Sequence, residues 1–213
     1  MNRTNIVMVV TSVVLAAIGG CGGSETPVAT GFLSDYSKLQ AVSDSSFRYL
    51  DKTARGKYTA FIVDPVAVHF KEGAKAIKKK SQGKLTEQDI RDLTNYFHDA
   101  IVKAITVSGY SIAYRPYSGV GRIRVAITDM EETRVVLAAV PQTRLLTGAG
   151  VGGAAMEGEL VDSMTGKQIA AIVESKAGSR VPFTGLSEWG GAKSAIDEWA
   201  KRIKDRLDEA QNK

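Results

Sequence analysis

The only cysteine of the 213-residue chain, Cys21, directly follows an apolar run that extends from Ile6 to Ile18. One positive charge, Arg3, precedes this run, and small residues end it. A helix needs roughly 20 apolar residues to span a bilayer, so the run is too short for a stable membrane span and is typical of an export signal. With a single cysteine the chain forms no internal disulfide, and its fold must depend on a hydrophobic core.

The residues that lead into this cysteine, Ile18-Gly19-Gly20-Cys21, resemble the lipobox of bacterial lipoproteins. The glycines on both sides of Cys21 disfavour the alternative, a buried cysteine inside a helix. We therefore predict that Cys21 carries a lipid anchor, a diacylglycerol with a further acyl chain such as palmitate. Neither residue after Cys21 is the aspartate that retains such lipoproteins in the inner membrane. The resemblance implies the periplasmic face of the outer membrane of a Gram-negative bacterium.

The rest of the chain reads as one domain. We predict a signal peptide over residues 1–20, a lipidated cysteine with a flexible tether over 21–31, and a single domain over 32–213. The formal net charge of the chain is +5. This mild excess of positive charge favours acidic partners, but export argues against nucleic acid as the partner.

Periodicity predicts two amphipathic helices. The first has Thr86 as its N-cap and ends before Gly109, and the second covers Gly191–Leu207, with Trp199 in its buried stripe. We expect Gly31–Leu39 and Phe47–Asp51 to form an extended arm. The predicted strands are Tyr58–Phe70, interrupted at Asp64-Pro65, then Ser111–Pro116, Gly119–Met130, and a β-hairpin from Met156 to Ser175 that turns at Asp162–Gly166.

These elements predict an α/β (α+β) fold. We expect a single domain with a mainly antiparallel or mixed sheet of about five strands and two long amphipathic helices packed on one face. Arg122 and Arg124 alternate with apolar residues, as Glu157 and Glu159 do. If their strands are neighbours, cross-strand charge pairs join them on the outer face of the sheet.

Three sequence patterns could indicate a nucleotide-binding, metal-binding or catalytic site, and each also has a structural explanation. Residues Gly148–Gly153 match G-x-G-x-x-G, but a β-hairpin follows where a nucleotide site needs a helix, so we predict a flexible loop. His69 and His98 have no nearby histidine or cysteine to complete a metal site, so we predict no metal and no cofactor. Five acids could pair as acid and base in a hydrolase, although salt bridges and turn caps explain them as well: Asp64, Asp129, Glu157, Glu159 and Asp162.

A cluster of lysines precedes the first predicted helix. It could bind anionic lipid or glycolipid headgroups, or it could be a solvated loop that leads into the helix. The candidate residues for an anionic ligand are Lys71, Lys75, Lys78, Lys79, Lys80 and Lys84.

Several segments together resemble one family. GFLSDYSKL, IVDPVAV, RIRVAITDM, GELVDSMTGKQIAA and AIDEWAKRIKDRL are similar to marker segments of the bacterial lipoproteins grouped as domain of unknown function 3313. The family supplies no catalytic residues to carry over. The hairpin followed by a long helix also resembles, more loosely, the TolB N-terminal-like domain of envelope lipoproteins, in which such domains bind partners or assemble.

Our leading functional hypothesis is a non-enzymatic, outer-membrane-anchored periplasmic lipoprotein that binds an envelope protein partner or supports assembly. The membrane contact is the lipid on Cys21, and the sequence leaves the oligomeric state and the identity of the partner open. The alternatives are a binder of anionic lipid or glycolipid through the lysine cluster, and a hydrolase that acts on an envelope polymer.

Overall fold

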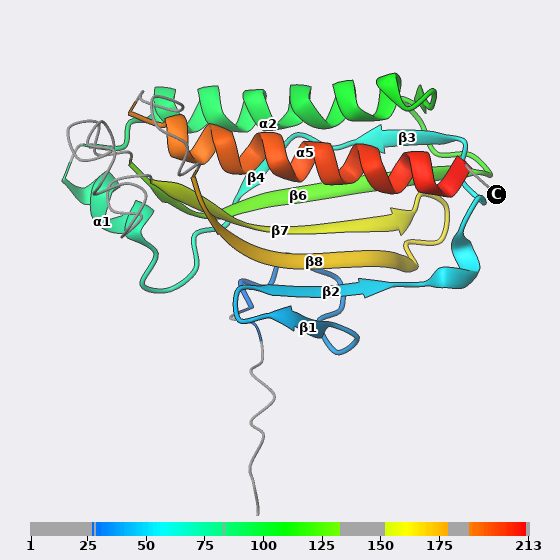
Figure 1. Ribbon diagram of the computed structural model, residues 1–213, viewed down its shortest axis with the longest axis horizontal. Helices are drawn as coiled ribbons and strands as arrows, with labels where there is room; N and C mark the ends of the chain where they lie inside the picture. The colour runs from blue at the N-terminus through cyan, green and yellow to red at the C-terminus, as the bar shows by residue number, and fades with distance from the viewer. Residues whose placement is uncertain (1–26, 28, 83, 133–151, 179–187, 212–213) are drawn as a thin grey trace, which may run out of the picture.

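The chain folds into one layer of sheet and one layer of helices (Figure 1). The structure is a computed structural model that describes residues 27, 29–82, 84–132, 152–178 and 188–211. Within these residues eight strands form a single mixed sheet, in the order β1-β2-β8-β7-β6-β3-β5 with β4 also paired to β6. Two long helices, α2 and α5, cover one face of the sheet, as predicted.

The centre of the sheet is an antiparallel meander. Strand β6 (Val120–Glu131) pairs with β7 (Gly153–Asp162), and β7 pairs with β8 (Gln168–Ala177). The turn between β7 and β8 uses Gly166 at φ 72°, a backbone conformation that favours glycine. The predicted hairpin and the predicted β6 strand are therefore confirmed.

The side of the sheet beyond β8 corrects one prediction. Residues Phe47–Asp51 were expected in an extended arm, but most of them belong to β2 (Ser46–Leu50), which pairs antiparallel with β8. Strand β1 (Gln40–Ser43) adds the outer edge. Segments this short carry too few residues to show a strand period, and only the pairing of β2 with β8 and of β1 with β2 makes them strands.

The other side of the sheet corrects a second prediction. The segment Tyr58–Phe70 was expected to be one central strand, but it forms two short strands, β3 (Ala60–Val63) and β4 (Ala67–Val68), both parallel to β6. They are separated at Asp64-Pro65 as predicted, because proline has no N–H to donate to the ladder. Strand β5 (Ser111–Ile112) pairs with β3 at this edge. Strand β5 was predicted within Ser111–Pro116. The expected count of about five strands was too low because β1 and β2 were not predicted and Tyr58–Phe70 was counted as one strand.

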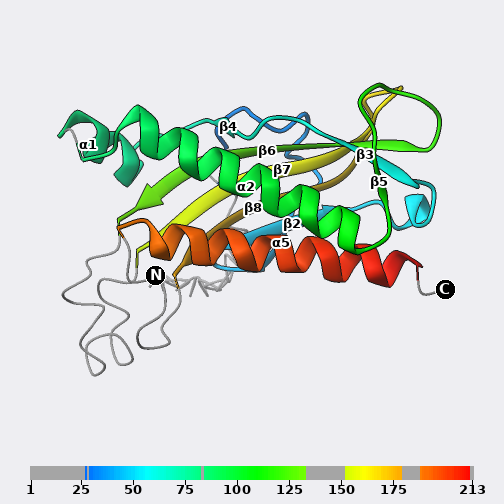
Figure 2. The ribbon, with the colours of Figure 1, turned by 90° about the horizontal axis from the view of Figure 1, so that it is seen from above.

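The helices bury a continuous apolar core against the sheet. Helix α2 (Glu87–Val107) begins with a capping box, in which the Thr86 side chain accepts from the Asp89 backbone N–H while the Asp89 side chain accepts from the Thr86 N–H. Helix α5 (Gly190–Gln211) lies beside α2 (Figure 2). Phe97 of α2 stacks on Trp199 of α5, with ring centroids 5.6 Å apart. Trp199 is thus a core residue, as predicted.

A third helix was not expected. Helix α1 (Lys75–Ser81) contains most of the lysine cluster that the sequence analysis left open as a binding patch or a solvated loop. It lies at one end of the long axis of the molecule (Figures 1 and 2). None of the described helices combines the length and apolar character that a membrane crossing requires.

Candidate functional site

The sheet face opposite the helices is crossed by the segment Thr30–Tyr36, which we call the arm. Met156 and Leu160 of β7 point into the helix-side core, so the alternating Glu157 and Glu159 point to the other face. Glu157 is 0% exposed, and it accepts hydrogen bonds from the Thr30 N–H and hydroxyl at 2.9 Å and from the Tyr36 hydroxyl at 2.5 Å. Burial, and then the bond to Glu157, raises the pKa of Tyr36.

Glu159 holds the middle of the arm. Its carboxylate accepts from the Ser34 N–H at 2.9 Å and the Ser34 hydroxyl at 2.7 Å. It also pairs with Arg124 of the neighbouring strand at 2.5 Å. The Arg124 guanidinium in turn lies over the Phe32 ring of the arm, 5.2 Å from its centroid, and His69 meets the same ring edge-on at 5.3 Å. The arm is therefore fixed by buried acceptors and by aromatic packing.

The predicted charge pairing across β6 and β7 is confirmed for Arg124 and Glu159, which are register partners. Arg122 instead donates to Asp64 at 2.9 Å. Glu157 and Glu159 both lie on the sheet face away from the helices, as predicted, and the arm covers them there. An extended arm over Gly31–Leu39 was predicted, and it overlaps the observed arm. Its position over these acids was not predicted, since nothing in the pattern of β7 distinguishes a solvated acid from one that binds a distant segment.

The remaining candidate acids have structural partners as well. Asp129 accepts from the backbone N–H groups of Ala76 and Met130. Asp162 caps the β7–β8 turn by accepting from Met164 and Thr165, and it also accepts from the Tyr58 hydroxyl. All five acids that the hydrolase hypothesis needs thus hold backbone or side-chain donors within the domain.

The lysine cluster is partly neutralised inside the domain. Lys75 pairs with Glu131 at 2.6 Å, Lys80 with Glu87 at 2.6 Å, and Lys79 with Glu132. The other three lysines, Lys71, Lys78 and Lys84, have no ion pair among the residues that the structure describes. The structure therefore brings the cluster together on and around α1 but leaves it with less free charge than its sequence implies.

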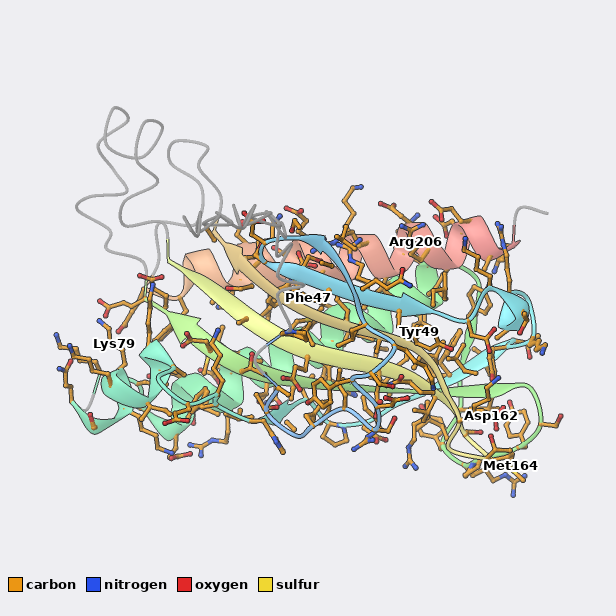
Figure 3. All side chains as sticks on the ribbon, turned by 90° about the horizontal axis from the view of Figure 1, so that it is seen from below. Phe47, Tyr49, Lys79, Asp162, Met164 and Arg206 are labelled. Atoms are coloured by element: carbon orange, nitrogen blue, oxygen red, sulfur yellow. The ribbon has the colours of Figure 1, made fainter. Side chains whose placement is uncertain are left out.

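At the opposite end of the long axis, loops from three parts of the chain meet. We call the exposed side chains Lys57, Tyr114, Arg115, Tyr117 and Met164 the tip surface. Tyr114 is 93% exposed, Met164 64% and Tyr117 47%. Figure 3 shows Met164 at this end and Lys79 of α1 at the other.

Backbone contacts hold these loops together. The Ser163 N–H donates to the Val120 carbonyl at 3.1 Å, which joins the β7–β8 turn to the start of β6. The Thr59 N–H donates to the Gly119 carbonyl at 3.0 Å, and Gly119 adopts φ 83° in the turn before β6. The tip surface was not predicted from the sequence, in which its one signal is a pair of tyrosines on either side of Arg115-Pro116 in a loop.

The described residues also include one open depression and one histidine on a helix. An open depression of about 410 Å³ lies beside Pro27 and is lined in part by Phe47, Lys71 and Val173. His98 lies on α2 next to Asp99. Within the described residues no group of three histidine, cysteine, aspartate or glutamate side chains is arranged to hold a metal ion.

Two predictions fall largely outside the described residues. Cys21 and the signal peptide lie before the first of them. Of the glycine run, only Gly152 and Gly153 are described, and Gly153 begins β7. A strand therefore follows this run, as predicted, where a nucleotide-binding loop needs a helix.

The described geometry defines a class of protein. It is a single α/β domain with a mixed sheet, which two helices cover on one face and the hydrogen-bonded arm covers on the other. The family model for the proteins of unknown function DUF3313 matches residues 28–203. The chain therefore belongs to this family, as the resemblance of its segments indicated. A search of curated proteins finds no match.

Solved structures give distant similarities. Two dodecamer structures of PelC from Paraburkholderia phytofirmans, one of them a variant, align with TM-scores of 0.41 and 0.42 and identities of 11% and 12%. The alignments cover 78% and 77% of this chain and 96% of each PelC chain. With similarities this low, the comparison says nothing about how the present chain assembles.

Proposed function

We propose that this chain is a periplasmic lipoprotein, anchored to the outer membrane through Cys21, whose domain binds an envelope protein partner and performs no catalysis. The observation that carries the proposal is the arm: the segment that follows the lipobox-like residues is strapped to the sheet by the buried carboxylates of Glu157 and Glu159. A likeness to the TolB N-terminal-like envelope domain is part of this proposal.

The arm supports an anchored role because it limits where the domain can lie. At roughly 3.3–3.6 Å per residue, the chain between Cys21 and Thr30 spans at most about 30 Å. A lipid on Cys21 therefore keeps the arm-covered face close to the membrane. A domain held in this way meets partners that are themselves in or near the envelope.

The alternatives receive less support from the described side chains. The acids of the hydrolase hypothesis are occupied by internal donors, and three lysines of the cluster are occupied by glutamates. A group that already has an internal partner gives little additional attraction to a ligand, because the internal pair must first be broken.

Lipidation and capture test the proposal together. Cells that express the full-length chain are labelled with palmitate and fractionated, and the protein is crosslinked in the intact cell. We expect label in the protein, recovery with the outer membrane and a crosslinked protein identified by mass spectrometry. The Cys21→Ser variant should lose all three. The proposal would be contradicted if the wild-type protein carried no palmitate label, or if the Cys21→Ser variant remained in the outer membrane to the same extent as the wild-type protein.

A further inference from the structure

We propose that the tip surface binds an acidic segment of a protein, in which carboxylates flank an apolar side chain. The inference rests on the proposed function for the location of the partner in the envelope. The chemical character of the partner is inferred from the tip surface alone. The relevant residues are two cations, two tyrosines and a methionine that three loops bring to one end of the molecule.

The cations of the tip surface favour a negatively charged partner. Lys57 and Arg115 are both exposed, and neither has an ion pair among the described residues. In the adjoining loops, Asp51 pairs with Lys167 at 2.8 Å and Asp162 caps the β7–β8 turn. Both cations of the tip surface are therefore available to pair with carboxylates of a partner.

The apolar part of the tip surface favours a protein partner. Tyr114 is almost fully exposed, and Tyr117 and Met164 are exposed as well. Tyrosine, methionine and arginine are enriched in protein–protein interfaces relative to the remaining surface. Tyrosine and arginine are also the side chains that most often dominate the binding free energy of such interfaces.

The order of the loops favours a protein over a membrane surface. Asp162 accepts from the backbone N–H groups of Met164 and Thr165, so the turn that presents Met164 has a fixed backbone. The Val120 N–H donates to the Tyr117 carbonyl and the Ser163 hydroxyl to the same oxygen, which fixes the second loop against the first. Such a surface loses little conformational entropy when it binds a partner of matching shape.

The test uses the full-length protein purified in detergent. The probe is a random copolymer of glutamate and tyrosine, and vesicles of phosphatidylglycerol are tested in parallel. The tip variants are Lys57→Ala/Arg115→Ala and Tyr114→Ser. The matched control is Lys78→Ala/Lys84→Ala, which removes two exposed lysines at the other end of the molecule that have no ion pair within the described part of the chain. Unfolding curves verify that each variant retains the wild-type stability.

We expect the copolymer to bind the wild-type protein and the control equally, and each tip variant to bind it about tenfold more weakly or not at all. Equal binding by all variants, no binding by the wild-type protein, or a loss confined to the control would overturn the inference. Binding to the vesicles without binding to the copolymer would overturn it in favour of a membrane contact.

The copolymer measurement is independent of the lipid anchor, so it separates this inference from the proposed function. If the copolymer distinguishes the tip variants while the Cys21→Ser comparison fails, the tip inference is supported and the anchored role is contradicted. If the anchored protein captures a partner equally well with and without Lys57→Ala/Arg115→Ala, the tip inference is contradicted and the anchored role is supported.

Discussion

At the scale of single residues, the account depends on a few buried carboxylates that bind segments distant in sequence. Glu157 is the clearest case, because three donors of the arm converge on its fully buried carboxylate and no cation neutralises it in the described structure. A buried charge of this kind is tolerated only when its oxygens are well supplied with hydrogen bonds.

Replacement of this carboxylate should release the arm. We expect Glu157→Ala to lower the free energy of unfolding by about 3 kcal/mol, because it leaves the Thr30 and Tyr36 donors without an acceptor. Urea unfolding gives the stability, and hydrogen exchange at the Thr30 amide reports the arm itself. Glu72→Ala, at an exposed glutamate, is the control and should change stability by less than about 0.5 kcal/mol. Equal effects of the two substitutions would contradict the role given to Glu157.

The raised pKa values of two tyrosines lead to a prediction for the free energy of unfolding at alkaline pH. Burial, and then a hydrogen bond to Asp162, raises the pKa of Tyr58 to about 12, and burial with the bond to Asp197 raises that of Tyr96 to about 12. A phenol whose folded pKa exceeds its unfolded value of 10.0 stabilises the fold below that value and loses the contribution as pH rises through its folded pKa. The free energy of unfolding should therefore fall between pH values of about 10 and about 12.

Urea unfolding across this range checks the expectation. Tyr58→Phe and Tyr96→Phe should each make the decline less steep, since a residue without a phenol no longer titrates. An unchanged slope in both variants would show that other groups cause the decline.

At the scale of secondary structure elements, helix α5 is tied to the sheet by a buried carboxylate as well as by its apolar stripe. Glu174 of β8 accepts from Arg202 of α5 at 2.6 Å and from Arg48 of β2 at 3.2 Å. It is 6% exposed. The three residues come from three elements, so their pairing sets the position of α5 over the sheet.

Removal of this central charge should be costly. We expect Glu174→Gln to destabilise the fold by about 3 kcal/mol, because it leaves two partly buried arginines without their counter-ion. The matched control is Glu198→Gln, which breaks the more exposed pair with Lys176 and should cost less than about 1 kcal/mol. Thermal unfolding of both variants provides the comparison, and a larger loss for Glu198→Gln would contradict this assignment.

The elements differ in how well their sequences predicted them. Helix α2, helix α5, strand β6 and the β7–β8 hairpin carry long periods or clear turn residues, and each was predicted as an element. Strand β5 was predicted within Ser111–Pro116, but β1 and β2 were missed and β4 was merged with β3, because these strands have two to five residues and exist only through pairing with a neighbour. Helix α1 was missed because consecutive lysines show no amphipathic period.

The candidate sites were harder to predict than the fold for the same reason. The lysine cluster was visible as a run in the sequence, but its pairing with Glu131, Glu132 and Glu87 depends on tertiary contacts. The tip surface joins residues of three loops, so only the folded chain brings Lys57, Tyr114 and Met164 to one place. Local sequence patterns carry no information about which distant residues the fold brings together.

At the scale of the whole molecule, the described features divide between two regions. The arm and its buried glutamates occupy the sheet face that faces away from the helices, and the arm begins nine residues after the proposed anchor in the sequence. The tip surface lies at one end of the long axis, where Figure 3 places Met164 and Asp162. In our account the first region fixes the domain to the membrane, and the second binds the partner.

Site-specific photo-crosslinking in intact cells tests this division most directly. A photo-reactive phenylalanine analogue replaces either Met164 at the tip or Ile77, an exposed apolar residue of α1 at the other end. We predict that position 164 yields one defined protein adduct, that position 77 does not, and that Cys21→Ser abolishes the adduct. An adduct from position 77 alone, or one from position 164 that survives Cys21→Ser unchanged, would contradict the account.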